Sequence, residues 1–546
     1  NIDNGVIIMN KAIKFLLLAS SLFLFASCGG GGKYEEGVLR LNVGPEPQTI
    51  DPTLNSAIDG SIYIIHAFEG LAQKDKEGKI VGGVAESWDI SENGTKYVFH
   101  IRSNAKWSDG KPVVADDFVY SWRRAADPKT AANYSYQMEP LKNAKKITAG
   151  EMPVESLGVK AIDDNTLEVI LEAPTPYFDQ LMAYPVYFPL RRDIVEANPD
   201  TWTMSADTYI GNGPFKMTER QIDSKIVMEV NTNYWNLPVI VPKKLIFILM
   251  DNPTSVVAGI KDGSIYFSDR VPTQDMDTLK EEGYLKIKPY LGLYYYSLNV
   301  TNEALKDKRV RRALALSIDR NYIVEQVTRG GQTPAAAVVP PQISDITGSF
   351  RENGMDSFSL KAEDYQKNIE EAKKLLAEAG YPNGENFPVL EFKTNPGEHT
   401  SVFEAIQQMW KNNLGIDTTI VSEEWAVFQA SRYSRTYVIA RNGWIGDYDD
   451  PMTFLGMFLS YSPQNVESYN SAIYDRLLAN ASSTDDNNIR MPLLHKAEEL
   501  FMEDMPIIPL YYYTLPLLVN DNLKDVQYDV LGKHKFFYAY YDNTAK

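Results

Sequence analysis

Residues 388–441, PVLEFKTNPGEHTSVFEAIQQMWKNNLGIDTTIVSEEWAVFQASRYSRTYVIAR, switch repeatedly between two patterns. Runs rich in β-branched residues at 388–394, 416–422 and 436–441 predict strands. Apolar residues at helical spacing predict helices near 401–413 and 424–434. Strands that alternate with helices are typical of a parallel sheet covered by helices. This stretch therefore predicts an α/β fold.

The segment RNGWIGDYDD (441–450) begins where the last of these strands is expected to end. Ligands of open α/β sheets bind outside the carboxyl ends of the strands, so this segment is a candidate site. It holds an arginine, a tryptophan and several acids. A metal loop, a catalytic carboxylate site and a charged binding strand are all compatible with these residues.

The sequence offers little for metal binding or catalysis. Asp447, Asp449 and Asp450 lack the alternate spacing and the distal glutamate of a calcium loop, and the five histidines are far apart. No GxSxG or HExxH motif occurs, and Cys28 is the one cysteine. A glycosidase carboxylate pair can be hidden in any acidic chain, so a hydrolase stays an alternative. We expect no metal, no cofactor and no catalytic residue.

Length and charge narrow the class of protein. The 546 residues exceed one compact core and predict two to four domains. The net charge of −18 argues against nucleic acid as a partner, because phosphates repel an acidic surface. The 33 tyrosines suit either a concave ligand site or a tyrosine-rich core. Helices are also predicted at 116–126, 307–331 and 361–382.

The N-terminal region has the pattern of an export signal. Lys11 and Lys14 precede an apolar run at 15–27, which is too short to span a membrane. Cys28 follows, and then four glycines. We expect a signal peptide at 9–27 that begins at Met9, and a lipidated Cys28 on a tether at 28–33. Several acyl chains would hold the protein stably at a membrane surface, in the periplasm or on the outer face of the cytoplasmic membrane.

Longer blocks carry a resemblance to a known family. The segment VAESWDISENGTKYVFHIRSNAKWSDGKPVVADDFVYSW (84–122) is the most extensive block, and EEAKKLLAEAGY, RNGWIGDYDDPMTFL and PIIPLYYY follow in order. Together they resemble the periplasmic oligopeptide-binding proteins of solute-binding family 5. These proteins are the receptors of ABC-type peptide importers.

The resemblance implies a two-lobed, type II-like periplasmic-binding-protein fold of the large, three-domain class. The implied domains are a discontinuous first domain at 34–68, 192–291 and 515–546, a second domain at 69–191 and a third at 292–514. A short peptide would be enclosed between the first and third domains by hinge closure, in a monomer that delivers it to an ABC permease. Related receptors for murein peptides, signalling peptides, metal or haem remain alternatives.

Specific site residues also follow from the resemblance. Asp447 matches the residue that pairs with the peptide ammonium, and Arg441 matches one that pairs with the carboxylate. The other matching residues, expected to contact peptide termini, side chains or backbone, are Arg432, His399, Trp425, Trp444, Tyr134, Gly443, Ile445 and Ser56. Simpler interpretations are a surface ion pair for Arg441 and Asp447, and core packing for the tryptophans.

The chemistry of a peptide supports these roles. Every peptide presents one ammonium, one carboxylate and a regular backbone, and its buried charges must be paired. Arg441 and Asp447 are six residues apart, about 20 Å along a strand, whereas a tripeptide spans roughly 10 Å. Ser56 and Thr328 stand where a relative has glutamate and lysine. We expect the missing acid at Ser56 to weaken contact near the peptide N-terminus, and the missing lysine at Thr328 to alter which peptide lengths are accepted.

Overall fold

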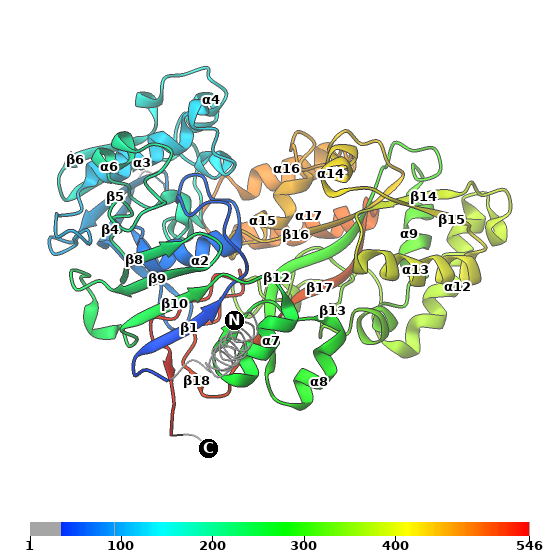
Figure 1. The fold of residues 1–546 in the computed structure, drawn as a ribbon. Coiled ribbons are helices and arrows are strands. Elements are labelled where there is room, and N and C mark those ends of the chain that lie inside the picture. Colours follow the sequence, from blue (N-terminus) through cyan, green and yellow to red (C-terminus); the bar gives the residue numbers. More distant parts are fainter. Residues whose placement is uncertain (1–33, 92, 545–546) are drawn as a thin grey trace, which may run out of the picture.

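A large mixed sheet organises the protein in the computed structural model, which describes residues 34–91 and 93–544. The expected signal peptide at 9–27 and the expected tether at 28–33, with Cys28, lie outside these residues. The sheet runs through both lobes of the molecule (Figure 1). Its strands are, in spatial order, β15 (Thr418–Ser422), β14 (Leu390–Thr394), β16 (Ile439–Ile445), β12 (Leu285–Leu298), β17 (Ile507–Val519), β11 (Phe267–Ser268), β1 (Val38–Asn42), β10 (Lys244–Ile248), β9 (Lys225–Val230) and β8 (Phe215–Gln221).

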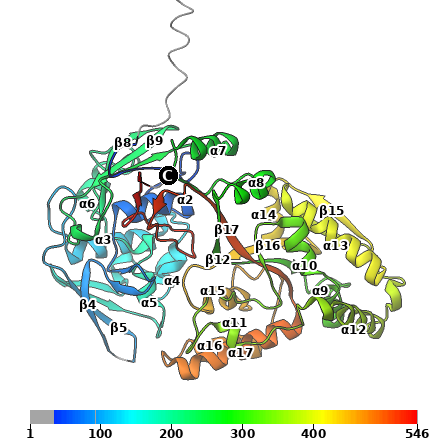
Figure 2. The same ribbon diagram turned by 90° about the horizontal axis from the view of Figure 1, so that it is seen from below.

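The strands β12 and β17 connect the two lobes. They pair antiparallel along most of their length, and Figure 2 shows them side by side between the two halves. At one end β17 pairs with β11, and further along it pairs with β13 (Thr333–Pro334). The register shifts between Pro289 and Leu293, at the point where the strands pass from one lobe to the other. An interruption of the ladder at this crossing is a suitable place for a hinge.

The first lobe carries a second, antiparallel sheet beside its part of the large sheet. Its order is β4 (Ala85–Ser91), β5 (Lys96–Ile101), β7 (Thr166–Ile170) and β6 (Val159–Asp163). The short pairs β2 (Ala72–Lys74) with β3 (Ile80–Gly82) and β18 (Leu523–Lys524) with β19 (Tyr540–Tyr541) complete it. The helices of this lobe are α2 (Ile58–Ala67), α3 (Ala115–Ala126), α4 (Ala144–Thr148), α5 (Phe178–Leu181), α6 (Arg192–Ala197), α7 (Pro253–Asp262) and α8 (Met276–Glu281).

A tight turn and an acid cap explain why α3 begins where it does. Gly110 has φ of +90°, a conformation that favours glycine, in the turn after Trp107. The Asp117 carboxylate then accepts hydrogen bonds from Val114 N and from Trp107 Nε1, at 2.9 and 3.1 Å. These bonds satisfy a free donor at the helix start and tie the turn to the helix. The predicted helix at 116–126 is confirmed.

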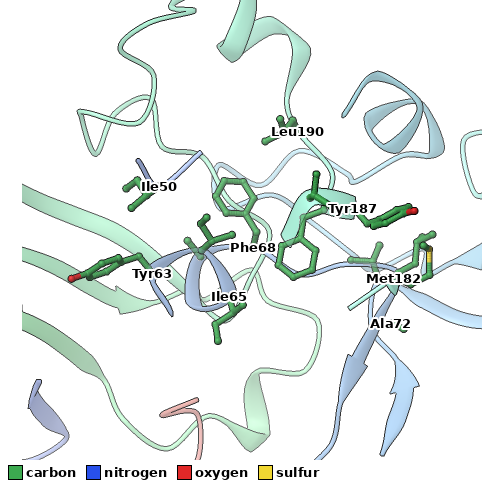
Figure 3. Close-up of a cluster of buried hydrophobic side chains, with 14 of the residues drawn as sticks. Ile50, Tyr63, Ile65, Phe68, Ala72, Met182, Tyr187 and Leu190 are labelled. Atoms are coloured by element: carbon green, nitrogen blue, oxygen red, sulfur yellow. The ribbon is translucent and has the colours of Figure 1, made fainter. Parts of the chain in front are cut away.

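One continuous hydrophobic core fills most of the first lobe, and α7 and α8 pack on a separate, smaller cluster. Figure 3 shows side chains from before and after residue 68 in contact, among them Phe68, Tyr187 and Leu190. Phe68 meets Trp107, Trp202 and Tyr209 edge to face. The expected first and second domains therefore pack on a shared core. Their boundaries stay a prediction.

The second lobe has its own core around β14, β16 and the second-lobe part of β12. Its helices are α9 (Lys308–Leu316), α10 (Arg320–Tyr322), α11 (Phe350–Asn353), α12 (Tyr365–Glu378), α13 (Glu398–Leu414), α14 (Trp425–Tyr433), α15 (Met452–Leu455), α16 (Ala472–Ala481) and α17 (Asn487–Asp504). β14 pairs parallel with both β15 and β16, which confirms the alternation predicted for 388–441. Of the described helices, none is long and apolar enough to cross a membrane.

Two sequence predictions need correction. The helix expected over 307–331 is broken after Leu316, because the Asp319 side chain accepts a hydrogen bond from Tyr322 N and starts a new helix, followed by a π-helical turn at Ile323–Thr328. The strand expected to end at Arg441 continues to Ile445, because β12 pairs with it throughout. Arg441 and Trp444 therefore lie within β16, while Asp447 lies beyond its end.

Candidate functional site

One edge of β16 is open over most of its length. β12 pairs with β16 from Ile439 to Ile445, whereas β14 pairs with it at Ile439 and Ala440 alone among the described strands. Asn299 N donates to Val438 O, and Gly446 N donates to Leu291 O, at 3.0 and 2.8 Å. Since backbone groups alternate along an antiparallel strand, Gly443 and Ile445 direct theirs away from β12. The free edge could therefore pair with another strand.

Arg441 lies near the start of this edge, beside aromatic rings. Its guanidinium is 5.6 Å from the ring centroid of Tyr294, and its Nε is buried without a hydrogen-bond partner in the described residues. The Tyr294 hydroxyl is 3.2 Å from Nδ1 of His399, whose ring stacks on Tyr294. Burial and the charge of Arg441 lower the pKa of His399 to about 4. His399 is therefore neutral near pH 7, and Arg441 supplies the positive charge.

A second arginine, Arg432, is held beside β16 by Asn442. Asn442 is buried and accepts a hydrogen bond from the Arg432 guanidinium, while its own amide donates to Ser297 Oγ at 2.9 Å. Gly443 N also donates to Asn442 Oδ1, at 2.9 Å. Arg432 is only 8% exposed, and its Nε has no hydrogen-bond partner in the part of the chain described. Two cations with unused donors thus lie close to the open edge.

Asp447 provides the negative charge beyond the other end of the edge. It is 9% exposed, and its Oδ2 accepts a hydrogen bond of 3.3 Å from Tyr136 of the first lobe. Burial raises the pKa of Asp447 to about 6, although the charge of Lys533 and the bond from Tyr136 oppose that rise. Lys533 Nζ lies 3.4 Å from the ring centroid of Tyr184. The carboxylate is therefore incompletely paired in a largely buried place.

The loop that carries Asp447 is fixed by neighbouring acids. Asp450 is buried and makes two hydrogen bonds to the guanidinium of Arg490, at 2.7 and 2.6 Å. Asp449 accepts hydrogen bonds from Ser344 N and Oγ, at 2.7 and 2.6 Å. These two acids hold the loop in place. No group of three His, Cys, Asp or Glu side chains in residues 34–91 and 93–544 is placed to hold a metal ion.

Two cavities lie on either side of Trp444. The first, of about 250 Å³, is lined by Arg432, Arg441, Trp425 and the backbone region of Gly443. The second, of about 430 Å³, lies between the lobes and is lined by Asp447 and Tyr136. Trp444 lines both, and its indole Nε1 is buried without a partner in the described residues. Trp425 is 48% exposed, so it is not an ordinary core residue.

Comparison with known proteins agrees with this geometry. The model of the bacterial extracellular solute-binding proteins, family 5, matches residues 79–466. The chain belongs to this family. The chain is 34% identical to the oligopeptide-binding protein OppA of Bacillus subtilis, over 97% of this chain and 99% of OppA. It is 35% identical to the periplasmic oligopeptide-binding protein OppA of Salmonella typhimurium, over 95% of each chain.

Solved structures of family 5 proteins confirm the two-lobed, type II-like fold. The unliganded open form of the murein tripeptide-binding protein MppA superposes with a TM-score of 0.80, at 32% identity, over 93% of this chain and 98% of MppA. Haemophilus influenzae OppA in complex with RPPGFSPFR gives a TM-score of 0.76, at 33% identity, over 93% of this chain and 99% of that one. The family consists of solute-binding receptors and is not an enzyme family.

The structure brings together most of the site residues expected from the sequence. Arg441, Trp444, Gly443, Arg432 and Trp425 line the smaller cavity, and Asp447 lines the larger one. Four further residues were expected at the site. His399 lies beside Tyr294, and the ring of Tyr134 stacks on Tyr184. Ile445 lies at the open edge of β16, and Ser56 lies before α2. Their roles toward a ligand stay predictions.

Ser56 and Thr328 lie outside the walls of the two cavities. Ser56 is exposed before α2 and lines neither cavity. Thr328 is buried, and its hydroxyl bonds to Gln332 Oε1 at 2.9 Å. A buried threonine that is hydrogen-bonded within its own turn does not present a polar group to either cavity.

Sequence reasoning did not find several site residues of this family 5 protein. Tyr136, Tyr184 and Lys533 surround Asp447. The two tyrosines come from segments 263 or more positions earlier in the chain, and Lys533 comes from the segment that follows the second lobe. Tyr136 follows Tyr134 at the spacing of one strand face, and this is a weak local signal. No local pattern marks Lys533, because only the folded chain brings it near Asp447.

Replacement of Arg490 by Met should show how firmly the Asp447 loop is held. The change leaves Asp450 buried without its cation, so we expect a loss of about 3–5 kcal/mol in the free energy of unfolding, measured with urea. The matched control is Arg309→Met, which breaks an exposed pair with Asp307 and should cost far less. Equal costs for the two variants would contradict the structural role of the buried pair.

Proposed function

We propose that the protein is an extracytoplasmic receptor that binds short oligopeptides by their charged termini and backbone, and delivers them to an ABC-type permease. The observation that most supports this proposal is the open edge of β16, with Arg441 near its start and the buried carboxylate of Asp447 beyond its end. An added strand on that edge gains affinity from its main chain, whatever its sequence.

Each part of the site has one task in this proposal. Asp447 pairs with the peptide ammonium, and Arg441 pairs with the carboxylate of a short peptide. Arg432 and His399 meet the carboxylates of peptides of other lengths. Gly443 and Ile445 pair with the peptide backbone. The open edge from Arg441 to Ile445 covers about 13 Å, and a tripeptide of roughly 10 Å fits within it.

The two cavities explain how peptides of different sequence could be accepted. Both are larger than one side chain and adjoin the open edge of β16 through Trp444. A receptor with roomy side-chain pockets selects a peptide by its termini and backbone. Tyr136, Tyr184 and Lys533 of the first lobe already lie around Asp447 of the second. Hinge motion about β12 and β17 would open this contact to admit a peptide and close it again.

The names of the relatives support a peptide ligand, and the family description supports a location in the cell envelope. We further propose that Cys28 is lipidated after cleavage of the signal peptide, and that the receptor acts as a monomer. Incorporation of labelled palmitate into the wild type, but not into Cys28→Ala, would test the anchor. Equal labelling of the two proteins would contradict it.

Asp447→Asn should abolish detectable binding of trialanine at pH 7.5, a loss of at least about a hundredfold by calorimetry, because the buried ammonium loses its counter-charge. Asp417→Asn is the matched control, since Asp417 is an exposed acid of the second lobe that pairs with Lys411 and lines neither cavity. The control should keep its affinity within about twofold. Unchanged affinity in Asp447→Asn would disprove the assignment of the ammonium site.

Peptide affinity should also fall as the pH is lowered from 7.5 to 5.0. The pKa of Asp447 in the free protein is raised to about 6, so the carboxylate becomes protonated and neutral through this window. The expected loss is about tenfold. Protonation of Lys533, whose pKa burial lowers to about 7, acts in the same direction, because it adds a cation near the ammonium. His399 titrates lower, at about 4.

The measurement for this pH dependence is calorimetry with trialanine in buffers of equal ionic strength. The residual binding of Asp447→Asn, measured at high peptide concentration, should change much less across the same range. A wild-type affinity that stays constant from pH 7.5 to 5.0 would contradict a role for the ionised carboxylate.

A further inference from the structure

The larger cavity is separate from the cation-lined one and has a different chemical character. It lies between the lobes, has a volume of about 430 Å³ and includes Asp447 in its wall. Trp444 divides it from the smaller cavity that contains Arg432 and Arg441. The part of a peptide nearest to it is the first residue, if the ammonium is held by Asp447.

The walls of this cavity are mainly apolar. Pro140, Pro174, Pro176 and Leu181 contribute from the first lobe, and Met452 and Met457 contribute from the second. The rings of Tyr177 and Tyr448 stack at 4.0 Å between their centroids and close one side. Such walls suit the aliphatic part of a side chain.

The rim of the cavity is acidic. Glu139 lines it and is exposed to solvent, and its side chain makes no hydrogen bond or ion pair in the residues that the structure describes. Glu172 lines it too, but accepts a hydrogen bond of 3.0 Å from Asn143 N. The lining cation, Arg490, is engaged by Asp450. Burial raises the pKa of Glu139, and the charge of Lys145, which does not line the cavity, opposes that rise.

The polar groups at the inner end of this cavity are directed toward Asp447. Gln137 lines the cavity and is 4% exposed, and hydrogen bonding from its side chain opposes the rise that burial causes in the pKa of Asp447, as the bond from Tyr136 does. The indole Nε1 of Trp444 is buried without a hydrogen-bond partner in the described part of the chain. The inner polar groups therefore belong to the ammonium site, and the acidic rim is left to interact with a side chain.

From these observations we infer that the larger cavity is a subsite for the first side chain of the peptide, and that it prefers lysine or arginine. This inference rests on the proposed function. The aliphatic stem would lie along the proline and methionine walls, and the cationic head would reach Glu139 at the rim. Long basic side chains commonly bury their stems and keep their charge in water. Glu139 would then determine specificity without being needed for binding itself.

The test compares three tripeptides that differ only in the first side chain: Lys-Ala-Ala, norleucine-Ala-Ala and Glu-Ala-Ala. Norleucine has an apolar stem similar to that of lysine but no charge. By calorimetry at low ionic strength, Lys-Ala-Ala should bind about three- to fivefold more tightly than the norleucine peptide, as for a partly exposed ion pair, and Glu-Ala-Ala should bind least well. The difference should shrink in 0.5 M salt.

Glu139→Gln should bring the lysine-to-norleucine ratio close to one and leave the norleucine affinity unchanged. The matched control is Glu151→Gln, an exposed acid of the same lobe that does not line the cavity, and it should keep the ratio. Equal binding of the lysine and norleucine peptides by the wild type would overturn the inference, as would a preference that survives in Glu139→Gln. Failure of all three peptides to bind would instead overturn the proposed function.

Discussion

An ionised carboxylate at Asp447 is energetically unfavourable because it is buried, and the groups around it compensate only in part. A carboxylate that is 9% exposed needs partners, and the structure provides a tyrosine hydroxyl at 3.3 Å and the more distant charge of Lys533. The raised pKa of Asp447 reflects this incomplete pairing. An ammonium group from a ligand would complete it. The loop cannot easily move Asp447 into solvent, because the buried pair of Asp450 and Arg490 anchors the loop in the core.

The same carboxylate joins ligand binding to the arrangement of the lobes. Asp447 and Tyr448 belong to the second lobe, while Tyr136 and Tyr177, their partners, belong to the first. Gln180 of the first lobe also exchanges hydrogen bonds with the backbone of Asp449, at 3.0 and 2.8 Å. The lobes are also joined through β12 and β17, where the register shifts. A ligand that neutralises Asp447 therefore acts at the place where the two lobes meet.

Local sequence predicted the elements whose partners lie nearby in the chain. The strands and helices of 388–441 are confirmed because each parallel strand is followed by the helix that covers it. The predicted end of β16 was wrong, since the length of this strand depends on its pairing with β12, almost 150 residues earlier. The long helix at 307–331 was wrong because Asp319 caps a new helix. The positions of Tyr136, Tyr184 and Lys533 around Asp447 depend on how the lobes pack, and no local pattern contains that information.

A crystal structure of the protein with trialanine would test the central claim most directly. The account predicts a peptide that lies along the open edge of β16 and exchanges backbone hydrogen bonds with Gly443 and Ile445. Its ammonium should lie about 3 Å from the Asp447 carboxylate, and its carboxylate should point toward Arg441. A peptide bound in the opposite direction, or away from β16, would contradict the account.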